Sequence, residues 1–161
     1  MDAVFKKLNL KNQKDVIVLN APESFKINLE SIRDEATVIT SLKDLSVIEF
    51  ILIFVTKQSE IDAVIPLIAP LLKGDALLWM CYPKGTSKKY KCDFNRDTGW
   101  TIMGNYDLEP VRMVAIDEDW SALRFIKVDF IKTMTRSSVH ALSEKGRMKT
   151  GNIDNAENEK I

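Results

Sequence analysis

The sequence predicts an α/β fold in which helices cover a mostly parallel sheet that ends in an antiparallel hairpin. Apolar runs of strand length recur at Val16–Leu19, Val47–Val55 (interrupted by Glu49) and Ala76–Tyr82, and such runs are typical of strands buried on both faces, as in parallel sheets. Segments with the apolar spacing of a helix separate them. Two further apolar runs, Val111–Ile116 and Ala122–Val128, lie close together in the sequence and therefore predict a hairpin.

The first half of the chain alternates between helix and strand patterns. A short helix or an arm is expected at Ala3–Leu10, ahead of the first strand. In Glu23–Ile32 apolar residues recur at spacings of four and three, which predicts a helix with one apolar face. Pro22 precedes this helix, at a position where its missing N–H costs no hydrogen bond. Thr37–Thr40 is β-branched throughout and predicts the second strand.

Val47–Val55 is the strongest strand signal in the chain and predicts a central strand. A helix is expected from Ser59, as its N-cap, to about Leu72, and Gly74 is expected to terminate it. Pro66 and Pro70 lie inside this pattern. Because each proline removes a helical hydrogen bond, the helix is expected to kink or to end early.

The pattern changes in the last third of the chain. A helix is predicted at Phe94–Tyr106, although two glycines weaken it. From residue 132 onward the chain is polar and lacks periodicity, which is typical of a flexible tail. The sequence therefore predicts a single α/β domain over 1–131 and a flexible C-terminal tail over 132–161.

The connection between the second and third strands is unusually short. Only six residues, Ser41–Ser46, separate Thr37–Thr40 from Val47–Val55, whereas a crossover between parallel strands normally takes about a dozen residues or more. Either this segment forms a single tight turn, or the second strand is not parallel to its neighbour. The first of these interpretations is favoured.

Composition excludes several functional classes. Lys+Arg and Asp+Glu number 23 each, so net charge attracts the chain to neither nucleic acid nor an anionic membrane. Two cysteines, Cys81 and Cys92, cannot form a disulfide framework, and Cys81 is expected to be a buried thiol. The N-terminal region lacks a signal-peptide pattern, and the longest apolar run is too short to span a bilayer. A cytoplasmic protein without a membrane partner is expected.

Four strings in the order VIVLNAPESF, FILIFVTKQSEI, LLWMCYPKGTSK and VAIDEDWSALRF together resemble a small bacterial family of unknown function, the DUF3052 type. The order of elements is also similar to a shortened methyltransferase-type Rossmann-like fold, whose members insert an antiparallel hairpin into the sheet. The resemblance covers roughly Val16 to Val128. It implies a three-layer Rossmann-like sandwich in a bacterial protein, and it carries no established activity with it.

The best site hypothesis places a ligand at one edge of the sheet. In open α/β sheets ligands bind outside the carboxyl ends of the strands, where the topology changes direction. Four segments are expected to converge there: Asn20–Ser24, Ser41–Asp44, Thr56–Gln58 and Tyr82–Gly85. The residues predicted to line a ligand cleft at this edge are Asn20, Pro22, Ser24, Asp44, Thr56, Tyr82 and Lys84.

Two features that an S-adenosylmethionine site of this fold requires are missing or displaced. A glycine-rich first turn lets the backbone approach the cofactor, but the turn Asn20–Ser24 contains no glycine. An acid at the tip of the second strand holds the ribose hydroxyls, but the nearest acid, Asp44, lies several residues beyond the expected tip. The missing glycines also argue against a nicotinamide cofactor, so no cofactor is assigned.

Lysines cluster after the last predicted parallel strand. Lys84, Lys88, Lys89 and Lys91 lie in KGTSKKYK with no acid between them. Such a cluster can bind phosphate or nucleic acid, with Tyr90 as a stacking surface, but a solvated loop is the more common outcome. Lys84 directly follows a buried strand, so it is the one lysine expected to be held in place.

No metal site is predicted. His140 is the only histidine and lies in the expected tail, and Cys81 and Cys92 lack the paired spacing of zinc ligands. The consecutive acids Asp117–Asp119 are expected to be solvated at the hairpin turn.

Three functions follow from these observations. The sequence favours a domain of unknown function, a non-catalytic methyltransferase-like scaffold that binds a small ligand or a protein partner. The first alternative is a divergent S-adenosylmethionine-dependent methyltransferase that holds its cofactor through Asn20, Ser24 and Asp44. The weaker alternative is a nucleic-acid adaptor that uses the Lys84–Lys91 loop. The residues alone leave enzyme and binding module both open.

Overall fold

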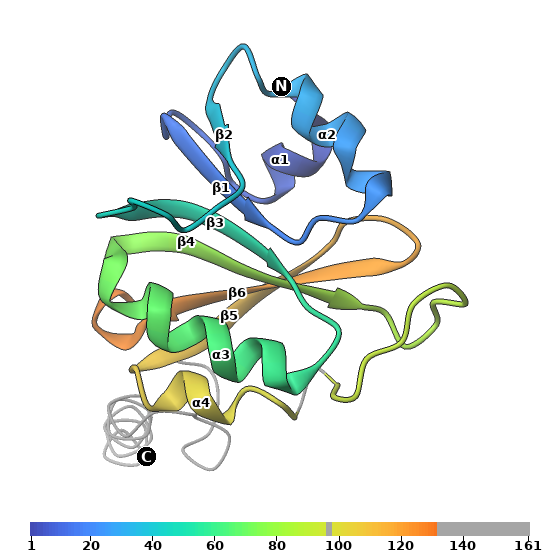
Figure 1. Cartoon of the computed structure of the whole chain (residues 1–161), viewed down its shortest axis with the longest axis vertical. Helices are drawn as coiled ribbons and strands as arrows, with labels where there is room; N and C mark the ends of the chain where they lie inside the picture. Colours follow the sequence, from blue (N-terminus) through green and yellow to red (C-terminus); the bar gives the residue numbers. More distant parts are fainter. Residues whose placement is uncertain (96–97, 132–161) are drawn as a thin grey trace, which may run out of the picture.

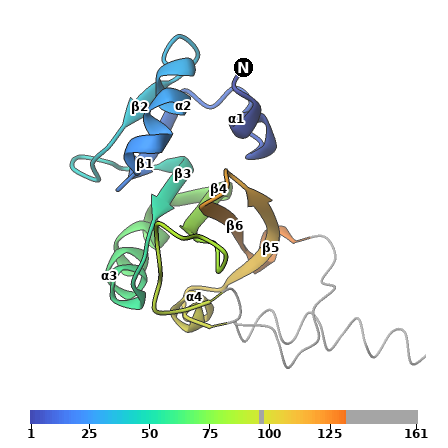
Figure 2. The same cartoon turned by 90° about the vertical axis from the view of Figure 1, so that its right-hand side faces the viewer.

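In the computed structural model, a six-stranded sheet lies between two layers of helices (Figures 1 and 2). The structure describes residues 1–95 and 98–131, and the predictions for the tail lie outside these ranges. The strands are β1 (Asp15–Leu19), β2 (Thr37–Ile39), β3 (Ile48–Phe54), β4 (Leu72–Pro83), β5 (Leu108–Ala115) and β6 (Trp120–Lys127). The helices are α1 (Ala3–Lys7), η1 (Glu23–Phe25), α2 (Lys26–Ser31), α3 (Gln58–Ile68), η2 (Ala69–Leu71), α4 (Thr101–Gly104) and η3 (Val128–Phe130).

The sheet is parallel on one side and antiparallel on the other. Its strand order is β2-β1-β3-β4-β6-β5. The strands β2, β1, β3 and β4 are parallel to one another, and β6 runs antiparallel to both β4 and β5. The predicted α/β class, with a mostly parallel sheet and a C-terminal hairpin, is therefore confirmed.

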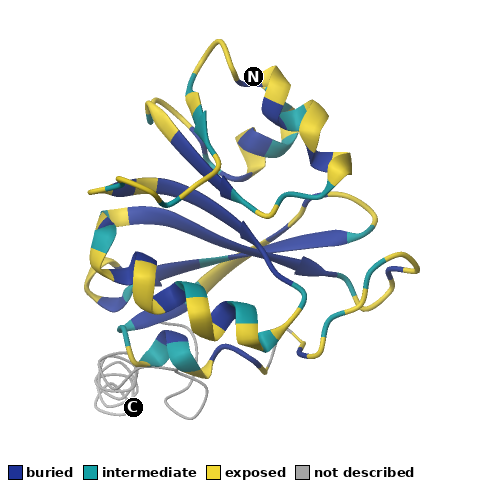
Figure 3. Cartoon of the chain, viewed as in Figure 1, coloured by how far each residue is buried: buried dark blue, intermediate teal, exposed yellow. Residues whose placement is uncertain are grey.

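The first helical layer consists of α1 and α2 and packs on the sheet through buried apolar side chains (Figure 3). The ring of Phe5 in α1 lies 5.6 Å from that of Phe25, which precedes α2. Trp79 of β4 is fully buried, and its indole N–H donates to the carbonyl oxygen of Leu8 at 3.0 Å. Side-chain burial and this hydrogen bond together fix α1 on the sheet.

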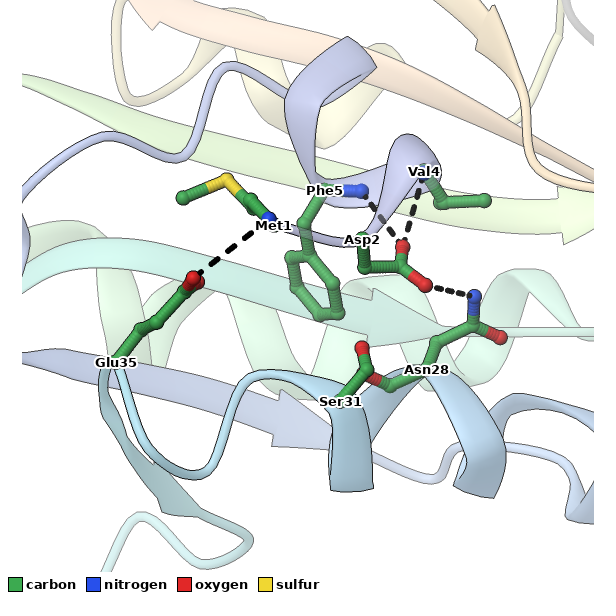
Figure 4. Close-up of polar contacts among 7 residues, drawn as sticks. All are labelled: Met1, Asp2, Val4, Phe5, Asn28, Ser31 and Glu35. Atoms are coloured by element: carbon green, nitrogen blue, oxygen red, sulfur yellow. Dashed lines mark hydrogen bonds and ion pairs between the residues drawn. The ribbon is translucent and has the colours of Figure 1, made fainter.

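Polar contacts join α1 to α2 (Figure 4). One carboxylate oxygen of Asp2 accepts hydrogen bonds from the backbone N–H groups of Val4 and Phe5 at 2.9 and 3.1 Å, which caps the start of α1. Its other oxygen accepts from the side-chain amide of Asn28 in α2 at 3.1 Å. The N-terminal ammonium group lies 3.7 Å from the carboxylate of Glu35.

The second layer consists of α3 and α4, and α3 does not begin as predicted. Lys57, rather than Ser59, is its N-cap residue, and the helix begins at Gln58. The reason is the carboxylate of Glu60, which accepts hydrogen bonds from the N–H groups of Thr56 and Lys57 at 2.8 and 2.9 Å. A side chain from inside the first turn therefore replaces the serine cap.

The end of α3 is early, as its prolines predict. The α-helix accommodates Pro66 but stops at Ile68, and a short 3-10 turn carries Pro70. Pro70, the second proline of the pattern, therefore lies outside the α-helix.

Gly74 does not end the helix, because β4 already begins at Leu72. Gly74 instead has a φ of 53° within the strand, a conformation that glycine adopts readily. The register between β3 and β4 shifts at this point, since Ile48 pairs with Leu72 but Phe50 pairs with Leu77. Gly74 therefore marks a bulge in β4.

The helix predicted at Phe94–Tyr106 is wrong for most of the residues that the structure describes in this range, where the α-helix is limited to α4 at Thr101–Gly104. Gly99 has a φ of 88°, and a Cβ at this residue would lie 2.8 Å from the Cβ of Phe94. The rings of Phe94 and Trp100 pack with their centroids 5.2 Å apart. Gly99 thus allows Phe94 and Trp100 to pack closely, so these two rings are buried without a continuous helix.

The short connection between β2 and β3 forms a single tight turn, as the sequence predicts. The N–H of Leu45 donates to the carbonyl oxygen of Leu42 at 3.3 Å, and Asp44 has a φ of 64°. Since β2 and β3 lie on opposite sides of β1, this connection crosses β1. Leu42 and Leu45 are half-buried and pack on the core. In this crossover of β1, the two leucines take the place of the helix that a longer connection would provide.

Candidate cavity at the carboxyl edge of the sheet

The carboxyl ends of the parallel strands lie at one edge of the sheet, which Figure 2 views from outside. The segment 84–95, which follows β4, lies across part of this edge. The N–H of Asp93 donates to the carbonyl oxygen of Thr56 at 3.2 Å, and the Asp93 carboxylate accepts from the N–H of Gln58 at 2.7 Å. These bonds attach the segment to the turn between β3 and α3.

A cavity of about 510 Å³ lies beside this segment, next to the hairpin strands. Its size is within the usual range of small-molecule sites, roughly 300–1,000 Å³. The residues that line it come from β4, from segment 84–95, from β5 and from β6. They are Tyr82, Pro83, Lys84, Gly85, Thr86, Ser87, Tyr90, Lys91, Cys92, Phe94, Asn95, Met113 and Ser121.

The hairpin turn fixes the loop that forms one wall of the cavity. The N–H of Lys84 donates to the carbonyl oxygen of Asp119 at 2.8 Å, and the hydroxyl of Ser87 donates to the Asp119 carboxylate at 2.8 Å. Asp117 accepts from the N–H groups of Asp119 and Trp120, both at 2.8 Å. Two of the acids expected to be merely solvated therefore hold the hairpin turn and the loop together.

Aromatic rings form the apolar wall of the cavity. Tyr82 and Phe94 lie with their ring centroids 6.0 Å apart, and Trp100 packs behind both, at 5.6 Å from Tyr82 and 5.2 Å from Phe94. All three side chains are buried. Close packing of buried rings in this way restricts their movement and favours a preformed wall.

The polar groups of the cavity carry positive charge. Lys84 and Lys91 line it, and none of the lining residues in the described ranges 1–95 and 98–131 is acidic. The thiol of Cys92 also lines it and donates to the carbonyl oxygen of Phe94 at 2.8 Å. The Tyr90 ring is not fully available for stacking on a ligand. It packs on Trp120 with ring centroids 4.9 Å apart, and the Lys89 ammonium lies 5.5 Å from its centroid.

The turn after β1 has a different role. Asn20 has a φ of 61°, and Pro22 is extended and precedes η1. The N–H of Phe25 donates to the carbonyl oxygen of Pro22 at 2.9 Å, and the buried Phe25 ring packs 5.1 Å from Phe54 of β3. Asn20 and Ser24 are exposed. The turn thus starts a helix and directs an aromatic ring into the core.

The remaining predicted residues also lie outside the cavity. The hydroxyl of Thr56 donates to the Glu60 carboxylate at 3.2 Å, next to the bond that its N–H makes with the same oxygen. Asp44 is exposed in the turn that crosses β1. Of the seven residues predicted from the sequence, Tyr82 and Lys84 line the cavity, whereas Asn20, Pro22, Ser24, Asp44 and Thr56 do not.

Sequence reasoning missed the side chains that the hairpin and the loop contribute. Ser121 lies beside Tyr82 because these residues pair across β4 and β6. The thioether of Met113 in β5 accepts a hydrogen bond from the Tyr82 hydroxyl at 3.4 Å. The hairpin itself was predictable, but its register against β4 leaves no local signal in the sequence. Phe94 was assigned to a helix that does not form.

Comparison with known proteins supports the fold and leaves the family open. No family model and no curated protein matches the sequence, so the resemblance to the DUF3052 type rests on its four strings alone. An S-adenosylmethionine-dependent methyltransferase from Aquifex aeolicus is 12% identical, with a TM-score of 0.54 over 77% of this chain and 87% of that chain. The fold is the methyltransferase-like Rossmann fold.

Two other structures of this kind are less similar. An RNA methyltransferase from Salinibacter ruber, in complex with S-adenosyl-L-homocysteine, is 12% identical, with a TM-score of 0.45 over 83% of this chain and 94% of that chain. A fibrillarin pre-rRNA processing protein from Methanococcus jannaschii is also 12% identical, with a TM-score of 0.44 over 73% and 67%.

The residues at the β1 turn do not fit the cofactor that the fold family implies. The turn Asn20–Ser24 contains no glycine that would let the backbone approach a cofactor, and the polar atoms of Thr56 are already bonded to Glu60. Among the described residues, no group of three or more His, Cys, Asp or Glu side chains could hold a metal ion. Within the same residues, no helix has the length and apolar character needed to cross a membrane.

Proposed function

We propose that the protein is a non-catalytic, methyltransferase-like domain that binds a small ligand in the cavity at the end of β4. The observation that carries this proposal is the cavity itself, about 510 Å³ in volume, with aromatic walls and a few polar groups. Apolar pockets with a small number of convergent polar groups are the usual form of small-molecule sites. The two predicted cleft residues that line it, Tyr82 and Lys84, are supplied by the same strand end.

The proposal assigns no reaction to the site. Among the cavity residues, the groups that could act as nucleophiles or bases are Cys92, two lysines, the hydroxyls and the tyrosines. The Cys92 thiol is committed to the Phe94 carbonyl, and the Ser87 hydroxyl is committed to Asp119. Among the described residues that line the cavity, none is a histidine or an acid that could activate them. A binding role therefore accounts for the arrangement better than a catalytic one.

A neutral fluorescent probe tests the cavity. N-phenyl-1-naphthylamine is expected to bind to the wild-type protein with one-to-one stoichiometry, and a Gly85→Trp variant is expected to weaken this binding at least about tenfold. Gly85 lines the cavity, and a Cβ at this residue meets no atom within 4 Å, so the new side chain can enter the cavity without straining the loop. Lys88→Trp, in the same loop but outside the lining, is the control. Equal binding by all three proteins would exclude the cavity as the site.

A divergent methyltransferase is the second candidate, favoured by the fold likeness to the Aquifex aeolicus enzyme. It would hold S-adenosylmethionine at the β1 turn through Asn20, Ser24 and Asp44. Thermal unfolding with S-adenosylmethionine and its demethylated product separates the two candidates, because a ligand at 100 times its Kd adds about 2.7 kcal/mol of stability. We expect no shift. A shift that Asn20→Ala and Asp44→Ala abolish, and that Gly85→Trp preserves, would replace the first proposal with the second.

A further inference from the structure

We propose that the ligand of this cavity is a planar aromatic molecule that carries a negatively charged group. This inference rests on the proposed function, because it names the class of ligand that the same cavity takes. Three features of the lining carry it: the charge of its polar groups, the nature of its apolar wall and its volume.

The charge of the lining is positive and uncompensated. Lys84 and Lys91 face no carboxylate within the lining, and neither forms an ion pair among the described residues. Two described acids of the adjoining segments are otherwise engaged: Asp119 accepts from the Ser87 hydroxyl, and Asp93 accepts from the Gln58 N–H. Two ammonium groups that have no acidic partner within the described part of the chain, beside an apolar wall, favour an anion and disfavour a cation.

The apolar wall is suited to a flat ring. The buried residues Tyr82 and Phe94 line the cavity together with Tyr90 and Met113. Aromatic side chains pack favourably on the face or edge of a planar ligand, and the thioether of methionine adapts to its outline. An aliphatic anion would leave these ring contacts unused.

The volume sets the size of the ligand. About 510 Å³ is far more than an inorganic anion would fill, and it accommodates a ring system with a charged substituent. The apolar wall and the lysines belong to the same cavity, so one molecule can use both only if ring and charge are joined. The hydroxyls of Thr86 and Ser121 are further polar groups in the lining.

A pair of probes with the same rings isolates the contribution of charge. 8-Anilino-1-naphthalenesulfonate carries a sulfonate, whereas N-phenyl-1-naphthylamine has the same ring system without it. Fluorescence titration of the full chain is expected to give a Kd for the sulfonate that is roughly fivefold or more below that of the neutral probe. In a Lys84→Gln/Lys91→Gln variant the two Kd values are expected to converge. Circular dichroism of each variant verifies that the fold is retained.

The matched control is Lys88→Gln/Lys89→Gln, which removes two charges from the same loop outside the cavity lining. It is expected to keep the preference for the sulfonate. If both probes bind equally to the wild-type protein, the charge inference is wrong and the cavity remains a ligand site. If the control variant also loses the preference, the effect comes from the net charge of the loop and the inference is overturned. If neither probe binds, the proposed function fails as well.

Discussion

At the scale of single residues, Asn20 explains how the turn after β1 dispenses with glycine. Its φ of 61° is in the left-handed region, which asparagine tolerates better than other residues with a side chain. The backbone can therefore make the bend, and Pro22 fixes the start of η1. The side chain of Ala21 packs against the core, so this turn serves the packing of the first helical layer.

Burial of Cys81 predicts how stability depends on pH. Complete burial raises the pKa of this thiol well above its ordinary value. Below the ordinary pKa both the folded and the unfolded chain keep the proton, so the thiol has no effect. Above it, the unfolded chain releases the proton while the folded chain retains it, so stability falls as pH rises.

One pH unit above the ordinary thiol pKa, this loss should reach about 1.4 kcal/mol. Urea unfolding at about pH 7.5 and pH 9.5 measures it. The drop between the two pH values is expected to be smaller by this amount in Cys81→Ala than in the wild-type protein, since lysines and tyrosines contribute equally to both. Cys92→Ala is the control and should keep the full drop. An identical drop in all three proteins would contradict the prediction.

At the scale of elements, local patterns predicted the strands and most of the helices. Long apolar runs such as Val47–Val55 form strands in this structure, because a strand in the middle of the sheet buries apolar side chains on both of its faces. Pattern reasoning failed where distant residues decide. From the sequence alone, Gly74 could mark either the end of a helix or a bend in a strand. The pairing between β3 and β4 determines that it lies in a bulge. The cavity was half predicted for the same reason: strand ends supply Tyr82 and Lys84, whereas register supplies Ser121.

The contact between α1 and α2 gives a prediction at this scale. Asp2→Ala should destabilise the protein by about 1–2 kcal/mol, because it removes the cap of α1 and leaves the Asn28 amide without its partner. Urea unfolding measures the change. Asp2→Asn keeps an oxygen for the cap and should recover most of the loss. Asn28→Ala should cost less than Asp2→Ala, and a larger cost would show that the link between the helices matters more than the cap.

At the scale of the whole molecule, the two faces of the sheet have different tasks. On the face of α1 and α2, aromatic contacts run without a break through Phe5, Phe25, Phe54 and Trp120. This chain of rings fills the region beneath the β1 turn. On the opposite face the aromatic rings stop at Tyr82 and Phe94, and the cavity begins there. The aromatic rings thus fill the core on the face of α1 and α2, whereas on the opposite face they also line the cavity at the end of β4.

This distribution predicts that residues 1–131 fold on their own. The three clusters of buried apolar side chains found in the described chain all lie between Phe5 and Ile131, on either side of one sheet. Elements packed on a common sheet should unfold together, in a single cooperative transition. A chain that stops at Ile131 is therefore expected to unfold at the same urea midpoint, and with the same slope, as the full chain. It should also bind N-phenyl-1-naphthylamine with unchanged affinity. A lower midpoint would show that residues beyond 131 contribute to the folded domain, and weaker probe binding at an unchanged midpoint would assign them to the ligand site.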